Sequence, residues 1–183
     1  MKQINMIIIL PMLLLLTACA TPGPQQVMLK PELSLTPANI GQGREIGVSV
    51  ADTRDNKTLG QRGGAAITSG RNIEEVVRDS VIKGLDIKGF TPILGTTLKR
   101  NLKVEIQKLS YTTFTGVWMA KAELKVTAIN DKSEIESVYR VEKESEVVFA
   151  PGAEQSEKIL NQSLAEVLNK LFEDRDLLAL LSR

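Results

Sequence analysis

The sequence contains no histidine and only one cysteine, Cys19, among its 183 residues. Histidine is the side chain most often used for proton transfer near neutral pH and for binding zinc. Catalysis by a Ser-His-Asp or Cys-His arrangement, or by zinc-bound water, is therefore excluded. A lone cysteine also cannot form a disulfide within the chain. We expect a protein that is not an enzyme and that carries no cofactor or metal.

The chain also has no excess of one charge sign. Its 23 Lys and Arg residues stand against 22 Asp and Glu residues, which gives a formal net charge of +1. A balanced chain has no general field that attracts nucleic acid. The content of 43% hydrophobic and 25% charged residues is that of one ordinary globular domain. We therefore expect a single domain with no nucleic-acid partner.

The sequence has no hydrophobic run long enough to cross a bilayer. The run from Met6 to Leu16 has eleven residues, whereas a membrane-spanning helix needs ~20. It follows Lys2 and ends at Leu16-Thr17-Ala18-Cys19, as a secretory signal does. These last four residues resemble a bacterial lipobox, the site of signal peptidase II. The resemblance implies that residues 1–18 are a lipoprotein signal peptide and that Cys19 is the lipid attachment site.

The lipidated cysteine also predicts where the protein resides. Two membrane signals suffice for stable anchoring, and a lipobox cysteine carries three acyl chains, palmitate among them. The residues after Cys19 are Ala20 and Thr21, without the Asp that marks inner-membrane retention in enteric bacteria. By that analogy the protein is anchored in the cell outer membrane and faces the periplasm.

Residues 19–43 contain four of the seven prolines, at positions 22, 24, 31 and 37. Prolines at this density exclude a helix and favour an extended, lipidated tether. The alternation of Leu33 and Leu35 around Ser34 leaves a second possibility open for residues 27–37. This segment could form an edge strand on the domain, because prolines are tolerated at the ends of such strands.

The periodic patterns of the chain lie between residues 44 and 183. Strands are predicted over 45–52, 102–111, 116–129 and 135–149, with a bulge at Lys108-Leu109 and a hairpin turn at 130–133. Amphipathic helices are predicted over 72–88 and 154–172, and a short apolar segment follows at 177–181. This order predicts an α+β domain, with two amphipathic helices packed on one face of a mostly antiparallel sheet. We expect residues 44–183 to fold without the tether.

A polar segment from Asp52 to Gly70 follows the first of these strands. It contains four glycines and few apolar residues, so it is expected to be a long loop, and long loops are often functional. Arg54 and Arg62 are therefore candidates for binding a partner. The alternative is that Arg54 pairs with Asp52 and braces the end of the strand. A catalytic or Ca²⁺ role for Asp52 and Asp55 is disfavoured, since acidic residues are ordinary turn formers.

Several of these features together resemble the YajG family of bacterial envelope lipoproteins. They are the lipobox, the proline-rich tether, the Val-Ser-Val-Ala-Asp-Thr-Arg segment, the Leu59-Gly60 pair, the helix ending in Lys88-Gly89-Phe90 and the hairpin before a C-terminal helix. The resemblance implies an α+β envelope lipoprotein without established catalytic residues. We expect a non-catalytic binding or assembly module that recruits an envelope protein or a cell-wall component. The alternative is a carrier or hydrolase for an envelope lipid or glycan.

Overall fold

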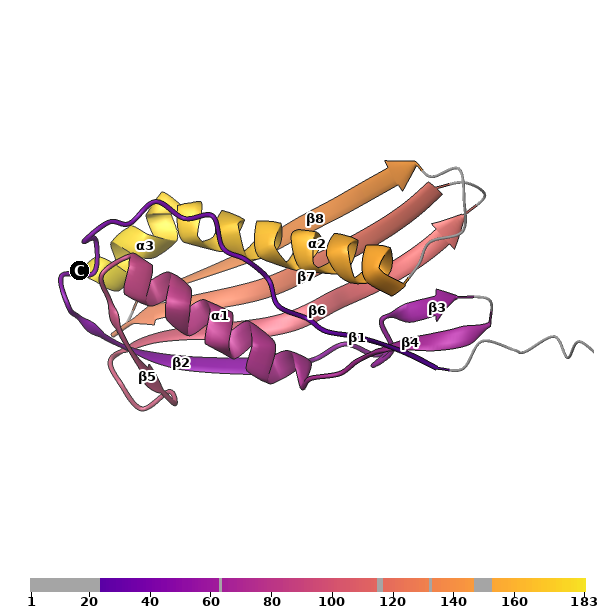
Figure 1. Ribbon diagram of the computed structural model, residues 1–183. Helices are drawn as coiled ribbons and strands as arrows, with labels where there is room; N and C mark the ends of the chain where they lie inside the picture. The colour runs from indigo at the N-terminus through magenta and orange to yellow at the C-terminus, as the bar shows by residue number, and fades with distance from the viewer. Residues whose placement is uncertain (1–23, 63, 115–116, 132, 147–152) are drawn as a thin grey trace, which may run out of the picture.

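The computed structural model describes residues 24–62, 64–114, 117–131, 133–146 and 153–183. The predicted signal peptide (residues 1–18) and Cys19 lie outside the described residues. In the described part the chain forms eight strands and three helices (Figure 1). The strands are β1 (Gln25–Val27), β2 (Glu45–Asp52), β3 (Gly60–Arg62), β4 (Ala65–Ser69), β5 (Thr91–Leu94), β6 (Arg100–Phe114), β7 (Val117–Asn130) and β8 (Ser133–Glu146). The helices are α1 (Ile73–Ile87), α2 (Ala153–Glu173) and α3 (Arg175–Ser182).

All eight strands belong to one mixed sheet, which corrects the expectation of a mostly antiparallel one. Strands β6, β7 and β8 are antiparallel neighbours, as predicted. Strand β2, however, runs parallel to β6 on one side and to β5 on the other. Helix α1 lies between β2 and β5 in the sequence and returns the chain to the same end of the sheet, which makes the pairing of β2 and β5 parallel. The α+β class is confirmed, and the predominance of antiparallel pairing is wrong.

The hairpin of β7 and β8 follows its predicted alternation. Side chains 118, 120, 122, 124, 126 and 128 of β7 are buried, while those between them are half-exposed. On the opposite face of the sheet, cross-strand ion pairs join Lys121 to Glu142 at 2.7 Å and Lys125 to Glu136 at 2.9 Å. The alanines at 120, 122 and 128 leave room for a helix to pack closely against the buried face.

Helices α1 and α2 cover the same face of the sheet (Figure 1). Asn72 caps α1 by accepting hydrogen bonds from the backbone N–H groups of Glu74 and Glu75. At the other end Gly89 adopts the left-handed conformation, with φ of 82°. These features confirm the predicted helix. The apolar segment at 177–181 belongs to α3, a third helix that Asp174 caps. None of the described helices is long and apolar enough to span a membrane.

Residues 28–43, called the strap below, pack against helices α1 and α2. The backbone N–H groups of Met28, Lys30 and Ser34 donate to side chains of α2 at 2.7, 2.6 and 3.1 Å. Leu29 is fully buried in the core. Farther along, the N–H of Ala38 donates to the carbonyl of Ile87 in α1 at 3.0 Å. The strap therefore crosses from α2 to α1. Of the segment 27–37, Val27 ends β1, a strand at the edge of the sheet, whereas residues 28–37 form neither a free tether nor a strand.

The segment between Asp52 and Gly70 contains more structure than the predicted loop. Strands β3 and β4 pair with each other as a short hairpin. Strand β4 also pairs with β1, and β3 pairs with β6 through Gly60 and Tyr111. The expectation of one long loop is wrong for residues 60–62 and 65–69, which form β3 and β4, because β1, from the predicted tether, supplies a partner strand for β4 from far away in the sequence. The part that remains a loop is residues 53–59.

Candidate functional site

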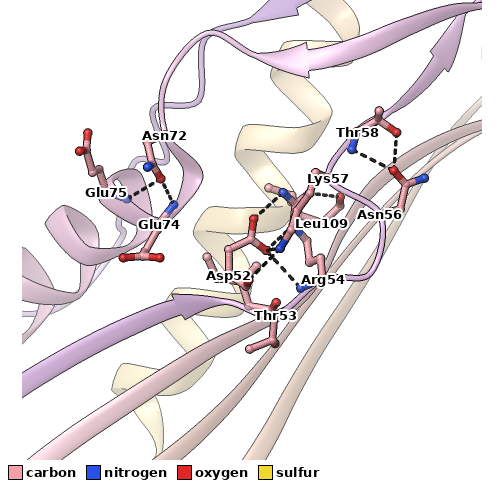
Figure 2. A network of polar contacts seen from close by, with 11 residues as sticks. Asp52, Thr53, Arg54, Asn56, Lys57, Thr58, Asn72, Glu74, Glu75 and Leu109 are labelled. Carbon is pink, nitrogen blue, oxygen red and sulfur yellow. Dashed lines mark hydrogen bonds and ion pairs between the residues drawn. The ribbon is translucent and has the colours of Figure 1, made fainter.

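Asp52 and Arg54 form a close ion pair where β2 ends (Figure 2). The guanidinium Nε and Nη2 donate to the two carboxylate oxygens of Asp52 at 2.8 and 2.9 Å, a bidentate arrangement. The backbone N–H of Arg54 donates to the same carboxylate at 3.2 Å. Only 4% of the Arg54 side chain is exposed. These contacts fix the direction in which the chain leaves the strand.

The third guanidinium nitrogen connects this pair to β6. Arg54 Nη1 donates to the carbonyl oxygen of Leu109 at 3.2 Å. Strand β2 pairs with β6 only as far as Asp52 and Ile106, and β3 begins to pair with β6 at Tyr111. Arg54 therefore fills the interval between these two strands along the edge of β6. A register shift between Ile106 and Lys108 lies in the same interval, close to the predicted bulge.

Further hydrogen bonds hold the rest of the loop (Figure 2). The N–H and hydroxyl of Thr53 both donate to the carbonyl of Ile106 at 3.1 Å. Lys57 Nζ donates to the backbone oxygen of Asp52 at 2.8 Å. The side-chain oxygen of Asn56 accepts from the N–H and the hydroxyl of Thr58, both at 2.9 Å. The loop thus has a defined conformation that its own side chains stabilise.

The electrostatics of the site follow from this pairing. Hydrogen bonding from the Arg54 side chain lowers the pKa of Asp52, and partial burial opposes that effect. A carboxylate held in its charged form by an adjacent guanidinium is a poor general base or acid near neutral pH. The chemistry of this pair is that of a structural brace.

A cavity of about 420 Å³ opens beside this braced loop, between the loop and the outer part of β6. We call it the braced groove. Asp55, Gln107 and Lys108 line it with exposed side chains. A second cavity of about 460 Å³ adjoins it and shares five of its lining residues. The two cavities lie at the end of the sheet that carries the β3–β4 hairpin.

The structure places the predicted site residues in different settings. Of the two alternatives for Arg54, the structure shows the second: Arg54 pairs with Asp52 at the end of β2, and its side chain is buried. Arg62 ends β3, where its backbone pairs with Ala65, and a role of its side chain in binding stays a prediction. Cys19 lies outside the described residues. Sequence reasoning did not identify the residues of β6 that line the groove. The only signal for them was the interrupted alternation of apolar residues at Lys108-Leu109.

Two other features of the described residues bear on possible sites. No group of three or more His, Cys, Asp or Glu side chains in the described ranges is arranged to hold a metal ion. Tyr139 is half-buried and donates a 2.6 Å hydrogen bond to Asp174, the cap of α3. Burial and this bond raise the pKa of the Tyr139 hydroxyl. The pair joins β8 to the C-terminal helix and is structural.

Comparison with known proteins gives similarities in fold and in family. No curated protein matches the chain. A protein from Xanthomonas campestris has a similar structure, with a TM-score of 0.62, 13% identity, and coverage of 80% of this chain and 92% of its own. An uncharacterized protein matches with a TM-score of 0.52, 14% identity, and coverage of 82% and 98%. At these identities the likeness shows the fold alone.

A minor lipoprotein from Acinetobacter baumannii has a TM-score of 0.47 at 4% identity, with coverage of 71% and 90%, and this likeness is too slight to support an inference. The sequence model of a family described as uncharacterized lipoproteins matches residues 31–182. That range includes most of the strap, the braced loop and all three helices. The chain therefore belongs to this lipoprotein family.

Proposed function

We propose that the protein is an outer-membrane lipoprotein, anchored through acyl chains on Cys19 and facing the periplasm, that serves as a non-catalytic binding or assembly module. Membership of a lipoprotein family supports the lipid anchor. The sequence features described above also resemble those of the YajG lipoproteins. The Asp52-x-Arg54 motif behind that resemblance is the pair that braces the groove.

The braced groove is the observation that carries the binding role. Its frame is held by the Asp52–Arg54 pair and by hydrogen bonds to β6, so the loop keeps its shape without a ligand. Asp55 and Lys108 present exposed charges on that frame. Polar groups that are already fixed around a concave surface bind a partner with only a small loss of conformational entropy. The partner is an envelope protein or a cell-wall component that meets these side chains.

Crosslinking in whole cells, followed by mass spectrometry of the captured partners, tests this role. The double variant Asp55→Ala/Lys108→Ala is expected to lose most of the partner yield while its thermal melt stays that of the wild type. Glu134→Ala, an exposed change on β8 outside the groove, is the matched control and should crosslink normally. Equal yields from the double variant and the control would reject the groove as the binding site.

The anchor is tested separately with Cys19→Ala. This variant should lose the acyl mass increment and should no longer float with the membrane fraction. A variant that still floats and keeps the acyl increment would show that the lipid is attached elsewhere. Separation of inner and outer membranes on a density gradient then tests the assignment to the outer membrane.

A further inference from the structure

The first described strand places the start of the folded domain at one end of the sheet. Gln25 in β1 pairs with Ile67, Ile67 pairs with Gly60, and Gly60 pairs with Tyr111 of β6. These four residues form a row across neighbouring strands. At a strand spacing of ~4.8 Å, three steps put Gln25 roughly 14 Å from Tyr111. The domain is therefore attached to its N-terminal segment beside the two adjoining cavities.

The distance from this point to the lipid is short. Cys19 lies six residues before Gln25, and six residues span at most about 20 Å whatever their conformation. Because β1 is parallel to β4, the start of β1 lies toward the β3–β4 hairpin tip (Figure 1). A lipid on Cys19 therefore holds this end of the domain within about 20 Å of the bilayer surface.

The opposite end of the sheet lies beyond that reach. Leu94 of β5 pairs with Val48, and Val48 pairs with Leu102 of β6. Leu102 and Tyr111 are nine positions apart along β6, which corresponds to roughly 30 Å at the rise of a strand. Leu94 is 64% exposed. In a domain that stands on its anchored end, this side chain lies far from the membrane.

The cavity linings at the two ends differ, although the anchored end of the sheet also carries charged residues, Arg62 in the hairpin and Lys143 and Glu144 in β8. The second cavity, called the uncharged hollow below, is lined in the described part of the chain by Asn, Thr, Gly, Gln and Tyr residues, none of them charged. The cavity at the opposite end is lined by Arg44, Glu45, Lys99 and Arg100, together with Leu98. Moving charged groups out of water is costly, and uncharged polar groups can instead exchange hydrogen bonds with headgroups.

We propose that the end formed by the β3–β4 hairpin and the uncharged hollow is the membrane-facing surface, in contact with the phospholipid headgroups of the leaflet that holds the anchor. This inference rests on the proposed lipidation of Cys19. It adds that the braced groove opens close to the bilayer, so its partner is met at the membrane surface. The opposite end, around Arg44 and Arg100, points into the periplasm.

The test uses the full lipidated chain, because acylated Cys19 leaves an introduced cysteine as the only free thiol. Thr112→Cys labels the proximal end and Leu94→Cys the distal end, and both wild-type side chains are exposed. Each variant carries an environment-sensitive fluorophore in vesicles of phosphatidylethanolamine and phosphatidylglycerol that contain a headgroup-nitroxide lipid. Quenching is expected to be several-fold stronger at position 112 than at position 94.

Equal quenching at the two positions would mean that the domain lies flat on the bilayer, and this would overturn the proposal. Stronger quenching at 94, or none at either position, would overturn it as well. As a control, a Gly-Ser linker of about 20 residues between Pro24 and Gln25 adds roughly 25 Å of mean reach and should abolish most of the difference. Intact mass and flotation of the same samples report on the anchor. Acylated protein with the wrong quenching pattern therefore refutes the orientation alone.

Discussion

Arg54 shows how one side chain can complete a sheet where two strands leave an interval. Its guanidinium spans the carboxylate of Asp52 and the carbonyl of Leu109 at the same time. A lysine at this position would supply a point charge without the planar fork that reaches both acceptors. The sequence shows the motif Asp52-x-Arg54, which is compatible both with partner binding by Arg54 and with bracing of the strand end. The burial of the Arg54 side chain favours bracing. The sequence could not show this burial, because Arg54 donates to Leu109, which is 55 positions away.

Asp52 makes stability depend on pH in a defined direction. The pKa of Asp52 is lowered in the folded state from the ordinary value of 3.8. The contribution of Asp52 to the free energy of unfolding is therefore complete above that value and is lost as the pH falls below about 4. Asp52→Asn should cost roughly 3 kcal/mol at pH 7, because it leaves a buried guanidinium without its counter-ion. Urea unfolding from pH 7 to pH 3 measures the difference from wild type, which should shrink at the acid end.

The exposed carboxylate of Asp55 provides the control for this prediction. Asp55→Asn should change the urea midpoint little at any pH, since substitutions at exposed sites are usually within about 0.5 kcal/mol. A pH-independent difference between Asp52→Asn and wild type would contradict the bracing role of the ion pair.

Among the elements, those with a clear hydrophobic period were predictable and the short ones were not. Strand β7 and helix α2 bury alternate or three-to-four-spaced side chains, and these periods are present in the sequence. Strands β1, β3, β4 and β5 have three to five residues each, too few to establish a period. Their pairings also depend on segments far apart in the chain. The braced groove could not be predicted in full for the same reason.

Helices α1 and α2 meet at Gly84 and Phe172, where a Cβ added to Gly84 would overlap the phenyl ring. Helix propensity alone predicts that Gly84→Ala stabilises α1 by about 1 kcal/mol. Overpacking costs about 1–3 kcal/mol, so we expect a net loss. Urea unfolding of Gly84→Ala, of Phe172→Leu and of the double variant forms a double-mutant cycle. Gly84→Ala should cost less in the Phe172→Leu background, and a simple sum of the two single effects would contradict the predicted overlap.

For the whole molecule, two segments before residue 44, β1 and the strap, pack on the rest of the domain. Removing residues 24–43 would uncover the site of Leu29 and remove the hydrogen bonds to α2 and to Ile87. A chain of residues 24–183 should therefore unfold cooperatively, and a chain of residues 44–183 should have a lower urea midpoint or aggregate. Identical midpoints would support the original expectation that residues 44–183 suffice.

Two side chains of the strap provide a matched pair for this prediction. Leu29→Ala in the chain of residues 24–183 should cost about 2–4 kcal/mol, because Leu29 is fully buried. Met28→Ala at the neighbouring position should cost about 0.5 kcal/mol or less, because Met28 is 52% exposed. Equal costs would show that the strap contributes little to the core.

The strap also determines the order of events during biogenesis. Its hydrogen bonds to α2 join residues 129 to 135 positions apart, so they form only after the residues of α2 have been synthesised and have folded. Loop closure over such a separation is a late, slow step. Before it, the roughly 25 residues from Cys19 to Arg44 can extend to about 80 Å; afterwards, about 20 Å remains. In a chain anchored at Cys19, as proposed above, completion of folding would therefore draw the domain toward the lipid surface.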